Sequence, residues 1–81
     1  MNENKKFLFE SICKEHGISL DLKSLAHIIG ISASKANKIF MDYTEKQIIE
    51  KNILPRFKKI GRRRIWTAAS IAEWLDETEK A

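Results

Sequence analysis

The hydrophobic residues at the start of the chain recur at helical spacing. Within residues 4–16 they form one stripe, which consists of Phe9, Ile12, Cys13 and His16. Residues three and four positions apart lie on one face of a helix, so this spacing predicts a helix. Asn2 or Asn4 is a suitable N-cap, and Gly17 is typical of a helix end. Phe7 lies off the stripe and is expected to face solvent, a neighbouring element or a second subunit.

Two further stripes predict a pair of short helices within residues 21–43. The stripes consist of Leu22, Leu25, Ala26 and Ile29, and then of Ala36, Ile39, Phe40 and Tyr43. Ser19 or Asp21 caps the first helix, and Ser32 caps the second. Gly30 lies between them and can adopt the left-handed conformation that reverses the chain at a helix end. This arrangement predicts a helix-turn-helix pair.

After this pair, the spacing of the hydrophobic residues changes phase. Thr44 and Gln47 have the spacing of a capping box, which predicts a break near residues 42–44 and a new helix over residues 45–52. One long helix whose buried face shifts is the alternative. Pro55 prevents a helix from continuing, because proline lacks a backbone donor and its ring clashes with the preceding turn.

The last third of the chain predicts a β-hairpin over residues 56–67 and a closing helix over residues 68–79. The apolar residues that flank the hairpin's Gly61–Arg62 turn are Phe57, Ile60, Ile65 and Trp66. The inward face of the closing helix consists of Ile71, Trp74, Leu75 and Thr78. Its N-cap is Thr67 or Ser70, and Ser70-x-x-Glu73 has the spacing of a capping box. Both tryptophans are predicted to pack in the core.

A chain of 81 residues is long enough for one small domain, and the predicted elements make it mainly α-helical with a small β-hairpin, in the α+β class. The sequence has neither an apolar run of about 18 residues nor a charged and apolar leader, so we expect no membrane span and a cytoplasmic location. The single Cys13 suits a reducing compartment. His16 and His27 lack further metal ligands, and no catalytic pair is visible, so we expect no metal, no cofactor and no enzyme activity.

Most of the positive charge lies in one segment. Residues 1–50 contain seven lysines and seven acids, and residues 65–81 carry a net charge of −3. Residues 51–64 contain seven Lys and Arg residues and no acid, which accounts for the formal net charge of +4. Apolar residues and a glycine interrupt this basic run, so it is expected to fold as a projection. A folded cationic projection is a typical contact surface for phosphate.

Leu22–Ile39 resembles the DNA-binding helix-turn-helix signature. Alanine occupies its fifth position, glycine its ninth, and apolar residues its fourth, eighth, tenth, fifteenth and eighteenth. Leu54–Trp66, followed by the Ile-Ala-Glu-Trp-Leu run of residues 71–75, resembles the wing and closing helix of excisionase-type and MerR-like winged helix-turn-helix domains, and is similar to small phage and pyocin-activator regulators. The resemblance implies a winged helix-turn-helix fold. Ile39 and Pro55 are several residues further apart than is usual in these families, and the N-terminal helix is an addition.

The resemblance also implies that the helix of residues 32–43 enters the major groove of DNA. Its candidate DNA contacts are Ser32, Ser34, Lys35, Asn37, Lys38 and Met41. Asn37 suits adenine, and Lys38 suits guanine or a phosphate, whereas the serines suit phosphate oxygens. The wing cations expected on the backbone or in the minor groove are Arg56, Lys58, Lys59, Arg62, Arg63 and Arg64. In a simpler interpretation, Lys35 and Lys38 belong to a solvated helix face.

The predicted function is sequence-specific binding of double-stranded DNA by a small transcriptional regulator of a phage or mobile element. One alternative is an excisionase-like recombination directionality factor that bends DNA. Another is a protein-interaction adaptor that uses the apolar and acidic C-terminal face. A single module buries little surface on DNA, so self-association or cooperative binding is expected, with RNA polymerase or a recombinase as candidate protein partner. Both DNA-binding roles require the third helix and the hairpin to form one cationic surface.

Overall fold

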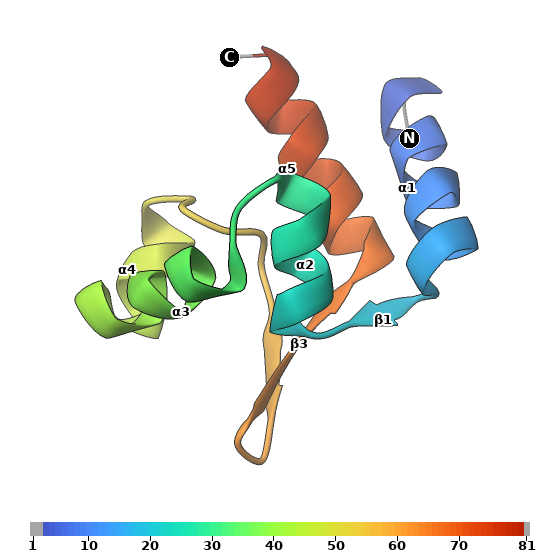
Figure 1. Ribbon diagram of the computed structural model, residues 1–81. Coiled ribbons are helices and arrows are strands. Elements are labelled where there is room, and N and C mark those ends of the chain that lie inside the picture. The colour runs from blue at the N-terminus through green and yellow to red at the C-terminus, as the bar shows by residue number, and fades with distance from the viewer. Residues whose placement is uncertain (1–2, 81) are drawn as a thin grey trace.

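The fold combines helices with one small antiparallel sheet, in a computed structural model that describes residues 3–80 (Figure 1). The helices are α1 (Glu3–His16), α2 (Leu22–Ile29), α3 (Ala33–Asp42), α4 (Glu45–Glu50) and α5 (Ala68–Lys80), and the strands are β1 (Ser19–Leu20), β2 (Lys58–Ile60) and β3 (Arg63–Thr67). The predicted class, mainly α with a small β-hairpin, is confirmed.

The corner between α2 and α3 follows from side-chain caps and one glycine. Asp21 is the N-cap of α2, and its Oδ1 accepts a 2.9 Å hydrogen bond from the backbone N–H of Ser24. Gly30 ends α2 in the left-handed conformation, with φ 81° and ψ 28°, which a side chain would strain. The small side chains of Ala26 and Ala36 are buried. Close approach of the two helices is therefore possible at this corner.

The chain breaks between α3 and α4 and does not continue as one helix. Thr44 caps α4: its Oγ1 accepts from the backbone N–H of Gln47 (3.2 Å), and its own N–H donates to Gln47 Oε1 (2.9 Å). The helix ends at Glu50, before the predicted residue 52, because Asn52 adopts a left-handed φ of 56°. Tyr43 was predicted to face inward, but it is the exposed C-cap of α3 because the helix ends before it.

β1 is an element that the hydrophobic pattern does not predict. It pairs antiparallel with β3, with Ser19 opposite Thr67 and Leu20 opposite Trp66. β2 pairs with the other edge of β3, which gives a three-stranded sheet in the order β1–β3–β2. A strand of two residues is too short to show the alternation that marks a strand. The pairing connects the segment before α2 to the hairpin.

An aromatic cluster in the core attaches α3 to the base of the hairpin. Trp66 of β3 is fully buried, and its Nε1–H donates to the carbonyl of Pro55 (2.9 Å). The ring centroids of Phe40, on α3, and Phe57 are 5.7 Å apart, and both rings contact Trp66. Trp74 is only partly buried, and its indole N–H donates to a backbone carbonyl after α4. The prediction that both tryptophans belong to the core is therefore fully met only by Trp66.

The start of α5 decides between the two predicted caps. Thr67 Oγ1 accepts from the backbone N–H of Ser70 (3.1 Å), whereas the Ser70 hydroxyl donates to the carbonyl of Arg56 (2.6 Å). Ser70 lies inside the helix, so its predicted capping box with Glu73 is wrong. Thr78 was predicted to face inward but is exposed, and its hydroxyl donates to a carbonyl of its own helix, 2.7 Å away.

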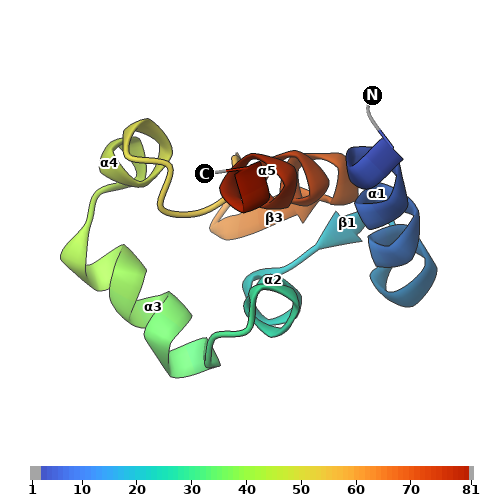
Figure 2. The same cartoon turned by 90° about the horizontal axis from the view of Figure 1, so that it is seen from above.

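α1 lies alongside α5, as Figures 1 and 2 show. Ile12 is buried in the core, and Nδ2 of Asn4 donates to Oδ1 of the buried Asp76 (2.8 Å). Asn4 is therefore inside the helix and not its cap, while Asn2 lies outside the described residues. Phe7 is 68% exposed, as its position off the stripe predicts. α1 enlarges the core at the opposite end of the fold from α4 (Figure 2).

Candidate nucleic-acid interface

The outward face of α3 is polar and exposed. Its exposed side chains include Ser34, Lys35, Asn37, Lys38 and Met41. They are exposed because Ala36 and Phe40, on the other side of the same helix, pack inward. Ser32 acts as the N-cap, and its Oγ accepts from the backbone N–H of Lys35 (3.0 Å). The helix has 10 residues, and an α-helix with its side chains is about 10–12 Å across, which matches the ~12 Å width of the major groove.

The β2–β3 hairpin projects beyond the helices and carries exposed cations (Figure 1). Lys58, Arg62 and Arg63 are exposed. Among the side chains that the structure describes, none of the ion pairs involves these three. Gly61 forms the turn with a φ of 63°, which suits glycine. The hairpin tip therefore presents exposed positive charge that forms no ion pair with the described acids.

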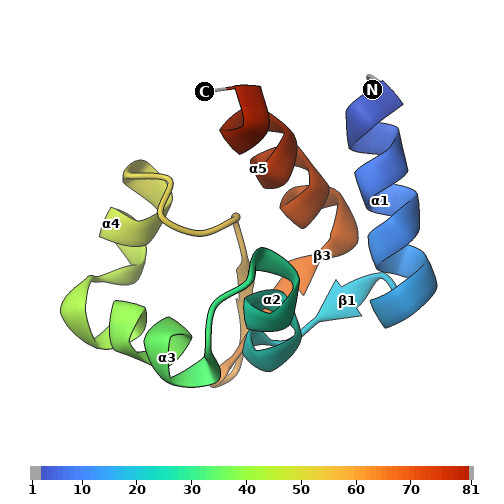
Figure 3. The ribbon, with the colours of Figure 1, turned by 45° about the horizontal axis from the view of Figure 1, so that its top comes forward.

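α3 and the hairpin lie side by side. Phe40 of α3 contacts Phe57, which precedes β2, and the guanidinium carbon of Arg64 lies 4.0 Å from the centroid of the Phe40 ring. Figure 3 shows α3 next to the hairpin, and Figure 1 shows the hairpin tip extending past the helix. The polar helix and the cationic hairpin are thus neighbours in the fold.

The start of α2 also lies against the hairpin. A hollow of about 300 Å³ is lined by Asp21, Leu22, Lys23, Arg62, Arg63 and Arg64. Lys23 is exposed there and is a candidate contact that sequence reasoning missed. Its place in the first turn of α2 gives no signal of this role, because only the pairing of β1 with β3 brings that turn to the hairpin.

Asp21 is an acid within this basic region. The backbone N–H and hydroxyl of Ser24 donate to its carboxylate, and together with the charge of Arg63 they lower the pKa of Asp21 although partial burial opposes the shift. The group is therefore ionised at neutral pH. Its charge stabilises the N-terminus of α2 and offsets part of the charge of the hairpin.

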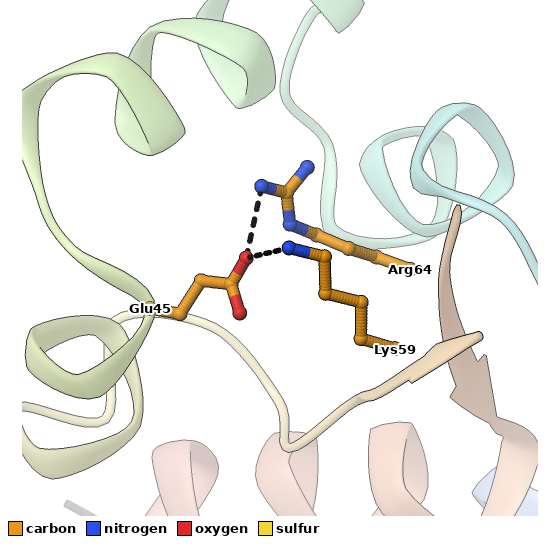
Figure 4. Close-up of polar contacts among 3 residues, drawn as sticks. All are labelled: Glu45, Lys59 and Arg64. Atoms are coloured by element: carbon orange, nitrogen blue, oxygen red, sulfur yellow. Dashed lines mark hydrogen bonds and ion pairs between the residues drawn. The ribbon is translucent and has the colours of Figure 1, made fainter. Parts of the chain in front are cut away.

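Glu45, the first residue of α4, forms an ion cluster with two hairpin cations (Figure 4). Its Oε1 lies 3.1 Å from Nη2 of Arg64 and 3.4 Å from Nζ of Lys59. Burial raises the pKa of Glu45, but hydrogen bonds from Arg64 and Lys59, with their charges, outweigh burial and lower the pKa below its ordinary value of 4.5. The carboxylate is therefore ionised at neutral pH and competes with other anions for both cations.

Arg64 differs from the other arginines of the hairpin because it is packed against the fold. Its side chain is 29% exposed, its Nε is buried without a hydrogen-bond partner, and its guanidinium lies over Phe40. Lys59 is half-exposed but is also paired with Glu45. Two of the predicted wing contacts are thus already engaged within the protein. Sequence reasoning missed Glu45, because acids are spread over the first fifty residues and none is marked by a motif.

Arg56 is not brought to the hairpin tip with the other predicted cations. It lines a separate hollow of about 240 Å³ between the end of α4 and the helix α5. The α5 residues that line this hollow include Glu73 and Glu77. Its carbonyl is tied to α5 by the hydroxyl of Ser70. The candidate interface therefore consists of the outward face of α3, the start of α2 and the exposed hairpin cations, without Arg56.

Other chemistry and the comparisons with known proteins add little to this picture. In the described part of the chain, His, Cys, Asp and Glu side chains form no group of three or more that could hold a metal ion. None of the helices within residues 3–80 has the length and apolar character needed to cross a bilayer. No family model, curated protein or solved structure matches this chain.

Proposed function

We propose that this protein is a cytoplasmic, sequence-specific double-stranded DNA-binding protein that acts as a small transcriptional regulator of a phage or mobile element. The observation that carries the proposal is the packing of α3, whose outward face is polar, beside a hairpin with exposed cations. The helix is narrow enough for the major groove, and the hairpin supplies the positive charge that phosphates attract. The proposal assigns binding, not catalysis.

In the proposed complex, the first turns of α3 lie in the major groove. The exposed carboxamide of Asn37 pairs with adenine, because its oxygen and nitrogen match the N6 and N7 atoms of that base. Lys38 contacts guanine or a phosphate from the same face. Ser34 and the N-terminal backbone of α3 contact phosphate oxygens, since a helix N-terminus attracts negative charge.

The hairpin contacts the backbone or the adjoining minor groove. Arginines favour a narrow, A·T-rich minor groove because its potential is more negative. The exposed cations of α3 and the hairpin that no described acid pairs are Lys35, Lys38, Lys58, Arg62 and Arg63. If each neutralises one phosphate, the logarithm of the affinity falls with the logarithm of the salt concentration at a slope of about −4.5.

A single module of this size contacts limited DNA surface, roughly 600–1,000 Å². We therefore propose that several protomers occupy repeated half-sites, either as a dimer or as cooperatively bound monomers. RNA polymerase is the candidate protein partner of the regulator. The position of Phe7, exposed on α1 away from the hairpin, leaves that helix accessible to a neighbour while DNA is bound.

The proposal is tested by selecting bound sequences from a random duplex pool with the full chain. Enrichment of one motif, repeated at a fixed spacing, is the expected result and also reports the number of protomers. Bending of the selected DNA together with recombinase-dependent excision would instead indicate a directionality factor. A chain that binds no duplex at ~100 mM salt, where phosphate contacts still hold, would contradict DNA binding and favour the protein-interaction adaptor.

A further inference from the structure

We infer that Glu45 is an internal counter-anion that holds Lys59 away from DNA and thereby limits the affinity of the hairpin for duplexes of any sequence. The inference rests on the proposed function. Among the described residues, Glu45 is the acid that forms ion pairs with cations of the hairpin (Figure 4). It lies on α4 and adjoins the proposed interface through Arg64, which packs on Phe40 of α3.

The position of Glu45 is set by the start of α4. The reciprocal hydrogen bonds of Thr44 and Gln47 fix the first turn of this helix, and Glu45 is its first residue. An acid in the first turn of a helix is stabilised by the unpaired backbone N–H groups there. The backbone of Glu45 is therefore fixed by its own helix, and its carboxylate reaches from there to the two hairpin cations.

Lys59 and Arg64 face this carboxylate together. They are directly opposite each other in the β2–β3 pairing, so their side chains share one face of the hairpin. Neighbouring residues along each strand point to the other face. The charge of the hairpin is thus divided in two. Lys59 and Arg64 lie on the face directed at Glu45, whereas Lys58, Arg62 and Arg63 are exposed at the tip and on the opposite face.

The two cations are held differently, which decides which one Glu45 controls. Arg64 is also held by its contact with the Phe40 ring at 4.0 Å and is 29% exposed. Lys59 is 50% exposed, and its only ion pair with a described side chain is with Glu45, at 3.4 Å. When the carboxylate is removed, Arg64 is expected to stay packed on the Phe40 ring. The same change releases the flexible Lys59 side chain to a phosphate.

The test is the salt dependence of binding to a random duplex, for the full-length chain and its Glu45→Gln variant. One additional phosphate contact is expected to steepen the slope by about 0.9 and to tighten binding about eightfold at ~100 mM salt. The matched control is Glu50→Gln, because Glu50 pairs with Lys46 on the same helix, at 3.9 Å and away from the hairpin. It makes the same change in net charge and is expected to keep the wild-type slope.

Two further variants separate release of Lys59 from other effects. Combining Glu45→Gln with Lys59→Gln is expected to restore the wild-type slope, because the released cation is gone. Glu45→Asp keeps the charge at the start of α4 but shortens the side chain by one methylene, and it is expected to steepen the slope without any change in net charge. Thermal unfolding of each variant establishes that it is folded, so Glu45→Asp serves if Glu45→Gln does not fold.

The outcomes distinguish this inference from the proposed function. If the folded Glu45 variants bind the duplex with the same affinity and salt slope as the wild type, the inference is overturned and the proposed function stays intact. A steeper slope that persists in the Glu45→Gln, Lys59→Gln double variant would also overturn it, because another cation would then be responsible. Absence of any duplex binding by the wild-type chain would overturn both.

Discussion

Replacing Arg62 and Arg63 together by alanine removes the charge of the hairpin tip with little expected effect on the fold. Both side chains are exposed, and neither contributes to the aromatic cluster that holds the hairpin. Each lost phosphate contact changes the salt slope by about 0.9, so the slope is expected to flatten from about −4.5 to about −2.7. The same arithmetic gives a loss of affinity of roughly 60-fold at ~100 mM salt.

The assay is fluorescence anisotropy of a labelled duplex, titrated with protein over about 50–400 mM salt. The matched control replaces Lys6 and Lys14 by alanine, because both are exposed on α1, a helix that lies away from the hairpin tip (Figure 1). This control loses the same charge and is expected to keep the wild-type slope. Equal slopes for the two double variants would show that the hairpin tip does not contact phosphate and would refute the interface.

Three more expectations concern base recognition, the fold and its pH dependence. Asn37→Ala is expected to relax sequence preference by about 1–3 kcal/mol, measured as the difference between selected and random duplexes, whereas equal losses on both would reassign Asn37 to the backbone. Gly30→Val is expected to destabilise the fold by about 1–2 kcal/mol or more in chemical unfolding, and Gly30→Asn by less. The cause is the positive φ of Gly30, because a Cβ at this position would meet no atom within 4 Å. Equal stabilities of the wild type and the two variants would contradict the left-handed corner. Asp21 has a lowered pKa, so its contribution to stability is complete above its ordinary value of 3.8 and is lost as the pH falls through the lower folded value. The difference in Tm between wild type and Asp21→Asn should therefore shrink below pH 3.8, and a constant difference would argue against the charge.

The contrast between Arg64 and its neighbours shows why the charge pattern alone was insufficient. In the sequence, Arg62, Arg63 and Arg64 are three equivalent cations at a predicted turn. In the fold, the third packs on Phe40 and pairs with Glu45, nineteen positions earlier in the chain. Arg64→Ala is therefore expected to lower stability by about 1–2 kcal/mol, as a lost cation–π contact does, and not simply to weaken DNA binding.

The local construction of this protein could be derived from its sequence. The spacing of apolar residues marks the helices, and each cap at Asp21, Ser32 and Thr44 joins atoms only three residues apart. Such interactions depend on neighbours in the chain and need no knowledge of the rest of the fold. The left-handed Gly30 corner belongs to the same class, because glycine adopts that conformation without steric cost.

Only the tertiary structure decided which surfaces these elements share. The pairing of β1 with β3 brings Lys23 to the hairpin, the Glu45 cluster occupies Lys59 and Arg64, and Arg56 lies beside α5. These relations join residues that are distant in the chain, and they depend on how buried faces pack against one another. A sequence pattern records which face of an element is buried, but the partner that covers that face is chosen by the packing of the whole core.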